Sequence, residues 1–199
     1  MAGKHKNLTA LVNETISDHK KLKDIISLLY DEDMEQRFIA AKALGEVARM
    51  EPEIIRQRWD RIFYAFDDTM CCWGAAEGLG EIGRNMPDMR SKIVLFLKKF
   101  QRDECSCQGF IWAICRIGQV DMKRVQNHIP DLINFLDSEN ACIVAQTIWA
   151  LGELGIKKAA GKIKSFLNDN RETWLYENYS ACIRTIGETA ADAVRKLQA

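Results

Sequence analysis

A short apolar phrase recurs along this chain at nearly constant intervals, and this periodicity constrains the fold more than any other feature. The phrase reads Ala-Leu-Gly-Glu-Val-Ala at residues 43–48 and Ala-Leu-Gly-Glu-Leu-Gly at residues 150–155. Two further copies end at residues 83 and 118, and a degenerate copy ends at residue 187, so that the steps are 35, 35, 37 and 32 residues. Internal repeats of this length are typical of helical-hairpin arrays.

Each copy predicts a pair of helices. The first helix carries the phrase and ends near its last residue, usually Gly, which suits the left-handed backbone at a helix C-terminus. The second helix follows a short turn, as over residues 90–100 and 129–136. Acidic turns such as residues 31–33 then place carboxylates where they cap the next first helix. Helices over residues 8–16 and 20–30 form a smaller unit at the start of the chain.

We therefore predict an all-α fold, an α-α superhelix of the HEAT-like or armadillo type with about five repeats and no sheet. A single domain covers residues 1–199, with a capping unit over residues 1–33 and repeats over residues 34–199. Such a stack buries a continuous core, because each repeat packs only against its neighbours.

Aligned positions of the copies have constant chemistry. Large apolar residues stand four and one before the end of each phrase, and small residues stand five before it. The first set is Leu44, Leu79, Ile114, Leu151 and Ile183; the second is Val47, Ile82, Ile117, Leu154 and Ile186; the third is Ala43, Gly78, Ala113, Ala150 and Cys182. These columns predict a buried core with close helix contacts. Mid-helix Gly45, Gly80 and Gly152 predict further close contacts, since glycine there costs about 1 kcal/mol relative to alanine.

The phrase A-L-G-E-[IV]-G with its D-x-D turns resembles the PBS-lyase-type HEAT-like repeat family over residues 20–199. The stretches 73–77 and 109–112 are similar to a subgroup of such proteins from anaerobic microbes. The resemblance implies a helical solenoid but little about function, since the family includes scaffolds, lyase subunits that handle bilins and an iron-dependent hydroxylase. That hydroxylase has His-Glu pairs near the start of its first helices. The matching positions here are Phe38-Ile39, Trp73-Gly74, Gln108-Gly109 and Ala145-Gln146, so the resemblance does not extend to its activity.

Composition and motifs favour a folded, non-catalytic protein. Apolar residues make up 47% of the chain and charged residues 28%. No apolar run is long enough to span a bilayer, and we expect a cytoplasmic protein without membrane association. The three histidines are scattered, and no phosphate-binding loop, serine-hydrolase elbow or zinc-protease motif occurs. We therefore predict no enzyme activity and no cofactor.

The seven cysteines fall into two groups. Cys115 and Cys182 stand at predicted core positions and are interpreted as packed thiols. The other five stand at the starts of three first helices: Cys71, Cys72, Cys105, Cys107 and Cys142. A metal or iron–sulfur site on this edge is the alternative hypothesis. Equivalent positions on packed helices lie about 8–10 Å apart, whereas zinc–sulfur bonds are about 2.3 Å. We therefore predict no metal on this edge. We also predict at least one accessible thiol among these five cysteines.

Two surfaces are candidates for partner binding. Trp73, Trp112 and Trp149 would form an aromatic stripe, with packing between repeats as the alternative. The predicted second helices, residues 51–66, 86–100, 122–136 and 157–167, carry thirteen basic and five acidic residues, although the whole chain has 28 of each. The residues that represent this basic face are Lys98, Lys99, Lys162 and Lys164. The alternative is that these side chains only keep the outer face of the protein solvated.

The leading functional hypothesis is a scaffold module that docks a protein partner, since a solenoid offers a long preformed surface. One alternative is nucleic-acid binding through the basic second helices. Another is a protein that handles a metal or cofactor through the cysteine edge.

Overall fold

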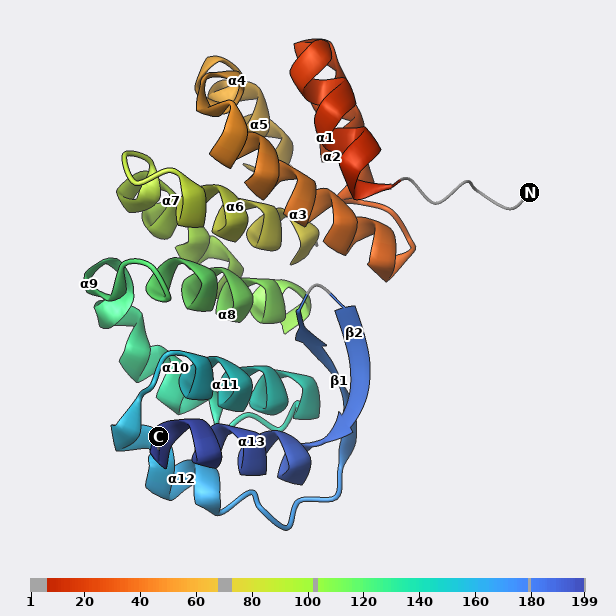
Figure 1. Ribbon diagram of the computed structural model, residues 1–199. Helices are drawn as coiled ribbons and strands as arrows, with labels where there is room; N and C mark the ends of the chain where they lie inside the picture. The colour runs from red at the N-terminus through yellow and green to blue at the C-terminus, as the bar shows by residue number, and fades with distance from the viewer. Residues whose placement is uncertain (1–6, 68–72, 102–103, 179, 199) are drawn as a thin grey trace. The chain divides into compact units, whose positions relative to one another are not determined.

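The computed structural model describes residues 7–67, 73–101, 104–178 and 180–198 (Figure 1). These residues are mostly helical and contain one two-stranded sheet. The structure divides into two compact units, residues 1–113 and residues 114–199, and the single repeat domain over residues 1–199 stays a prediction. Each unit is described by itself, and the superhelical path of the array stays a prediction.

The described part of the first unit consists of α-helices and short 3-10 turns. They are α1 (Leu8–Ser17), the 3-10 turn η1 (His19–Lys21), α2 (Leu22–Leu28), α3 (Met34–Met50), α4 (Pro52–Gln57), α5 (Trp59–Asp67), α6 (Trp73–Asn85), α7 (Arg90–Leu97), η2 (Lys98–Gln101) and the first part of α8 (Glu104–Gly118). The longest of these, α3, packs against α1, α2 and α6. The predicted helices over residues 8–16 and 20–30 are confirmed as α1 and as η1 with α2.

The second unit begins with the end of α8 and combines helices with the sheet. Its elements are α9 (Met122–Val125), η3 (Gln126–His128), α10 (Ile129–Phe135), α11 (Ala141–Glu153), η4 (Lys157–Ala159), α12 (Ala160–Lys164), β1 (Glu172–Glu177), β2 (Ser180–Thr185) and α13 (Ile186–Gln198). Helix α11 is central, because α10, α13 and β1 all contact it.

Short polar side chains cap the first helices. Asp33 Oδ1 accepts a hydrogen bond of 2.8 Å from the Glu35 amide and starts α3, as the acidic turn predicted. At α11 the cap is Asn140, whose Oδ1 accepts from the Cys142 amide at 2.9 Å. Among the described glycines only Gly155, after α11, has a left-handed backbone, with φ of 65°. The first four copies of the phrase therefore overlap helices, but the last residue of a copy is not always the last residue of its helix.

The predicted core columns are confirmed in four of the five copies. Leu44, Leu79, Ile114 and Leu151 have no exposed surface. The second column is also buried in these copies, as are the small residues beside it: Val47, Ile82, Ile117 and Leu154, with Ala43, Gly78, Ala113 and Ala150. Stacked apolar columns of this kind give each unit a continuous core.

Close helix approach at the mid-helix glycines is also confirmed. A Cβ on Gly80 would lie 2.5 Å from the Cα of Ala113, and a Cβ on Gly152 would lie 2.9 Å from the Cα of Ala193. A Cβ on Gly45 would lie 2.9 Å from the Cβ of Glu81. Because backbone atoms stand opposite Gly80 and Gly152, no side chain fits between these helices.

The prediction of an array without strands is wrong at residues 172–185, where β1 and β2 form an antiparallel hairpin. The degenerate fifth copy was wrong at two of its three column positions: Ile183 is 59% exposed in β2 and Cys182 is only half-buried, whereas Ile186 is buried as predicted. Aromatic and β-branched residues such as Trp174 and Tyr176 favour extended structure. Asn178, with φ of 50°, begins the turn. Helix α13 then starts where the copy was expected to end.

Strand β1 of the hairpin packs against helix α11 (Figure 1), and a buried glutamine of α11 binds to it. The Gln146 side chain on α11 donates to the Tyr176 carbonyl at 2.9 Å and accepts from the Tyr176 amide at 3.1 Å. The side-chain amide of Gln146 therefore pairs with the backbone of β1 as a neighbouring strand would. In turn α13 packs on α11, at Gly152, where the first helix of the next repeat was expected.

The column residues test the packing directly. Leu79→Ala and Leu151→Ala are each expected to lower the free energy of unfolding by about 2–5 kcal/mol, since both remove fully buried side chains. Leu95→Ala is the matched control, because Leu95 is 67% exposed. Urea unfolding of the four proteins checks this, and a loss at Leu95 equal to that at Leu79 contradicts the packing.

Candidate partner-binding groove

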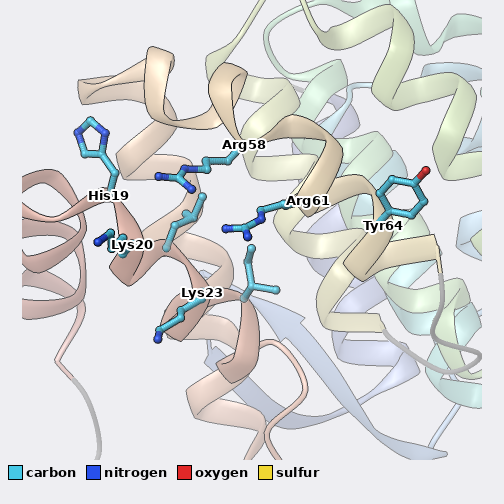
Figure 2. A pocket seen from close by; sticks show the side chains of 8 residues that line it. His19, Lys20, Lys23, Arg58, Arg61 and Tyr64 are labelled. Atoms are coloured by element: carbon cyan, nitrogen blue, oxygen red, sulfur yellow. The ribbon is translucent and has the colours of Figure 1, made fainter.

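A groove of about 710 Å³ lies between two helical segments of the first unit, and it is the candidate site of this chain (Figure 2). Its volume is in the range typical of ligand pockets. One wall is formed by η1 and α2, and the other by the residue before α5 and by α5 itself. The lining residues are His19, Lys20, Leu22, Lys23, Ile26, Arg58, Arg61 and Tyr64.

Helical spacing puts the cations of each wall on one side. Lys20 and Lys23 are three residues apart, and so are Arg58 and Arg61, so each pair shares a helix face. The opposite face of each helix packs into the core. On the first wall the buried residues are Ile25 in α2 and Leu29 directly after it, and on the second wall they are Ile62 and Phe66 in α5. The two helices thus hold their cations at the groove while their apolar faces fix them in place.

The charge of the groove is not neutralised within the described residues. None of the four side chains Lys20, Lys23, Arg58 and Arg61 has an ion-pair partner there, and no acidic side chain lines the groove. The nearby Asp24 instead lies 3.6 Å from Lys21. Four like charges around one concave surface repel one another and concentrate a positive potential.

The floor of the groove is apolar. Leu22 is buried and Ile26 is half-buried, and both come from α2 between the cationic rims. Figure 2 shows that Arg58 and Arg61 extend from their wall toward the segment that carries Lys20 and Lys23. Tyr64, which is 73% exposed, points the other way. The arrangement therefore combines an apolar base with positive charge on both sides.

Two of the four predicted binding lysines have internal roles. The Lys99 ammonium donates to the Phe66 carbonyl at 2.6 Å, near the end of α5, and lies 4.1 Å from the centre of the Phe96 ring. Lys162 donates to the Ile133 carbonyl at 3.2 Å and pairs with Asp137 at 2.6 Å. These cations satisfy helix C-termini. Lys98 and Lys164 are exposed, without such partners among the described residues.

Other basic residues of the second helices are engaged in the same way. Arg90 donates to the carbonyls of Gly83 and Arg84, both at 2.9 Å, and so caps α6. Arg56 pairs with Glu53 and, at 3.0 Å, with Asp88. Much of the predicted basic face is therefore part of the fold, and in the first unit Arg58 and Arg61 are left to face a groove.

Two of the three tryptophans predicted to form an exposed stripe are buried. Trp112 is 1% exposed and Trp149 is 7% exposed, so both pack in the interior. The packing interpretation is therefore confirmed for these two residues. The side chain of Trp73 lies outside the described ones.

The cysteine edge is described only in part. Cys71 and Cys72 lie outside the described residues, as does the Cys105 side chain. Cys107 is buried, and half-buried Cys142 accepts a 2.6 Å hydrogen bond from the Thr173 hydroxyl. The described residues contain no group of three side chains that could hold a metal ion. The predictions for metal and for an accessible thiol on this edge stay predictions.

The two cysteines interpreted as core thiols differ. Cys115 is buried as predicted. Cys182 is not a packed helix residue, because it stands half-buried in β2 with its thiol 3.7 Å from a Glu177 carboxylate oxygen. Burial, and next the Glu177 charge, raise the pKa of the Cys182 thiol.

A buried carboxyl group escaped the sequence prediction. Glu77 is 1% exposed in α6, and its Oε2 atom has no hydrogen-bond partner among the residues that the structure describes. Burial raises the pKa of Glu77 well above its ordinary value, while the Arg37 charge lowers it and the Glu81 charge raises it further. The residue stands six before the end of its phrase, the position of Trp112 and Trp149. A carboxyl group therefore occupies a position that holds buried tryptophan in two other copies.

Glu77 is expected to make stability depend on pH. Because its pKa is higher in the folded than in the unfolded chain, its contribution is fully present below the unfolded value and is lost as pH rises through the folded pKa. Glu77→Gln should therefore be more stable than the natural chain at pH 8, with a smaller difference at pH 5. Urea unfolding at both pH values measures this. Glu139→Gln, at an exposed position, is the control, and an equal Glu77→Gln effect at both pH values would contradict the assignment.

No family model and no curated protein matches this chain. Among solved structures, it is similar to a crystal structure of an engineered protein, with a TM-score of 0.55 and 18% sequence identity. The match covers 98% of this chain and 51% of the engineered one, so the chain spans about half of that protein. At this identity the likeness concerns the fold alone, and the resemblance to HEAT-like repeats stays a prediction. In the part of the chain that the structure describes, every helix is too short or too polar to cross a membrane.

Proposed function

We propose that this chain is a non-catalytic binding module of the cytoplasm that docks an anionic segment of a partner macromolecule between α2 and α5. The observation that carries the proposal is the set of four cations on both walls of one groove, Lys20, Lys23, Arg58 and Arg61, with no ion-pair partner among the described residues. This site retains the predicted role in partner binding and moves it to the groove between α2 and α5.

Placement, not composition, creates the positive charge. The chain has equal numbers of basic and acidic residues, and elsewhere many cations pair with carboxylates or helix ends. An anionic segment in the groove would relieve the mutual repulsion of the four cations, and concave low-dielectric walls strengthen this attraction. The planar guanidinium groups of Arg58 and Arg61 suit two-pronged hydrogen bonding to carboxylate or phosphate.

A rigid helical frame supports binding better than catalysis. The groove walls are anchored by buried residues such as Ile25 and Ile62, so its shape exists before a partner arrives. Preorganisation of this kind lowers the entropic cost of association. The lining offers positive charge and apolar surface, and its histidine, His19, has no carboxylate, cysteine or serine among the lining residues with which to form a catalytic pair. The HEAT-like resemblance adds to the proposal, since repeat arrays commonly present preformed binding surfaces.

Charge reversal at the groove tests the proposal. Arg58→Glu/Arg61→Glu is expected to weaken binding of at least one labelled polyanion, poly-L-glutamate or oligothymidylate, by about tenfold or more, because two favourable charges become repulsive. Fluorescence anisotropy at low salt provides the measurement. The matched control is Lys157→Glu/Lys158→Glu, which changes the same number of charges at exposed positions of the second unit.

Equal binding by the natural chain and both variants would place polyanion binding outside the groove. Absence of binding to either polyanion would contradict the proposed function itself. Urea unfolding of Arg58→Glu/Arg61→Glu shows whether the fold is retained, as expected for side chains that make no ion pair among the described residues.

A further inference from the structure

We infer that the segment docked in the groove is an amphipathic α-helix of a partner protein, with an apolar stripe flanked on both sides by acidic residues. This inference rests on the proposed function and names the chemistry of its partner. It follows from three features of the groove: its floor, its two walls and its aromatic content.

The floor requires an apolar ligand surface. Leu22 and half-buried Ile26 line the groove at its base, between the two pairs of cations. A ligand that carried only charge would leave this surface in contact with water or with a polar group. Because Leu22 is only 3% exposed, leucine or phenylalanine side chains in the groove would act mainly by removing the exposed part of Ile26 from water, which adds a favourable hydrophobic contribution.

The walls require acidic residues on both flanks of that apolar surface. Lys20 and Lys23 border one side, and Arg58 and Arg61 border the other. Each pair is separated by three residues, about 5 Å along a helix axis. Acidic residues at i and i+3 or i+4 on each flank of a partner helix have the same spacing, so that each flank meets one cationic wall. Apolar anchors at i, i+3, i+4 and i+7 would face the floor, as in recognition of a helix by a groove.

The aromatic content disfavours nucleic acid. Single strands bind to stacking platforms of several aromatic rings beside a cationic track. The described lining offers two rings, Tyr64 and His19, and Tyr64 points away from Arg58 and Arg61 (Figure 2), so the two rings form no continuous stacking platform beside the arginines. The apolar floor also has no counterpart on a phosphate backbone. A helix with acidic flanks uses both kinds of surface, whereas a nucleic acid uses only the charge.

Three probes of similar negative charge distinguish these ligands on the full chain. The first is a synthetic peptide of about 15 residues with leucines at i, i+3, i+4 and i+7 and glutamates on both flanks. The second has the same composition without helical periodicity, and the third is an oligothymidylate. We expect the amphipathic peptide to bind at least about tenfold more tightly than either of the others and to gain helical circular dichroism on binding.

Two variants separate charge from floor. Arg58→Glu/Arg61→Glu should weaken all three probes, whereas Ile26→Gln should weaken only the amphipathic peptide, by about fivefold or more. Leu95→Gln is the control for Ile26→Gln, because Leu95 is exposed on α7 away from the groove lining. Urea unfolding confirms that each variant is folded.

The outcomes are distinguishable. Equal binding of the two peptides, or tighter binding of the oligothymidylate, with loss in Arg58→Glu/Arg61→Glu, would overturn the helical partner and leave the anionic groove standing. Binding of the amphipathic peptide that does not change in Ile26→Gln would likewise overturn the inference. Failure of all three probes to bind would overturn both the inference and the proposed function.

Discussion

The close approach of neighbouring helices at glycine and alanine is the constraint on which the rest of the structure depends. Gly80 stands against the backbone of Ala113, and Gly152 stands against that of Ala193, with no room for a side chain in either place. This contact fixes the distance between successive first helices, and large apolar residues on either side of it then fill the core. The shorter helices pack around this frame with one face buried, which leaves the opposite face of α2 and α5 available to a partner.

The groove shows how a chain of zero formal charge makes a local positive site. The cations of the groove differ from the other basic residues of the chain in their surroundings. Lys99 and Lys162 are held by helix carbonyls, where they complete the fold. Arg58 and Arg61 extend instead toward the segment that carries Lys20 and Lys23. Basic side chains thus serve as caps where a helix end lies within reach, and Arg58 and Arg61 instead line the groove of the proposed function.

Periodicity predicted what depends on neighbours at a fixed sequence interval: the apolar columns, the glycine contacts and the buried position of Cys115. It failed at residues 182–185, which fit the column pattern although the strand-forming residues before them favour a hairpin held by Gln146. The composition of the second helices drew attention to Arg58 and Arg61, but not to Lys20 and Lys23. Those two lie in the capping unit predicted over residues 1–33, outside the second helices that were counted, and only the fold brings α2 beside α5. Likewise, the spacing of Trp112 and Trp149 does not reveal that both are buried.

The central claim is that an anionic partner segment binds in the groove between α2 and α5, and the methyl signals of isoleucine test it most directly. Titration of the amphipathic acidic peptide into the full chain, with isoleucine δ1-methyl groups labelled for NMR, reports on each position separately. The account predicts that the Ile26 signal shifts and saturates while the signal of Ile183, exposed on the hairpin, stays unchanged. A saturating shift at Ile183 with none at Ile26 would contradict it.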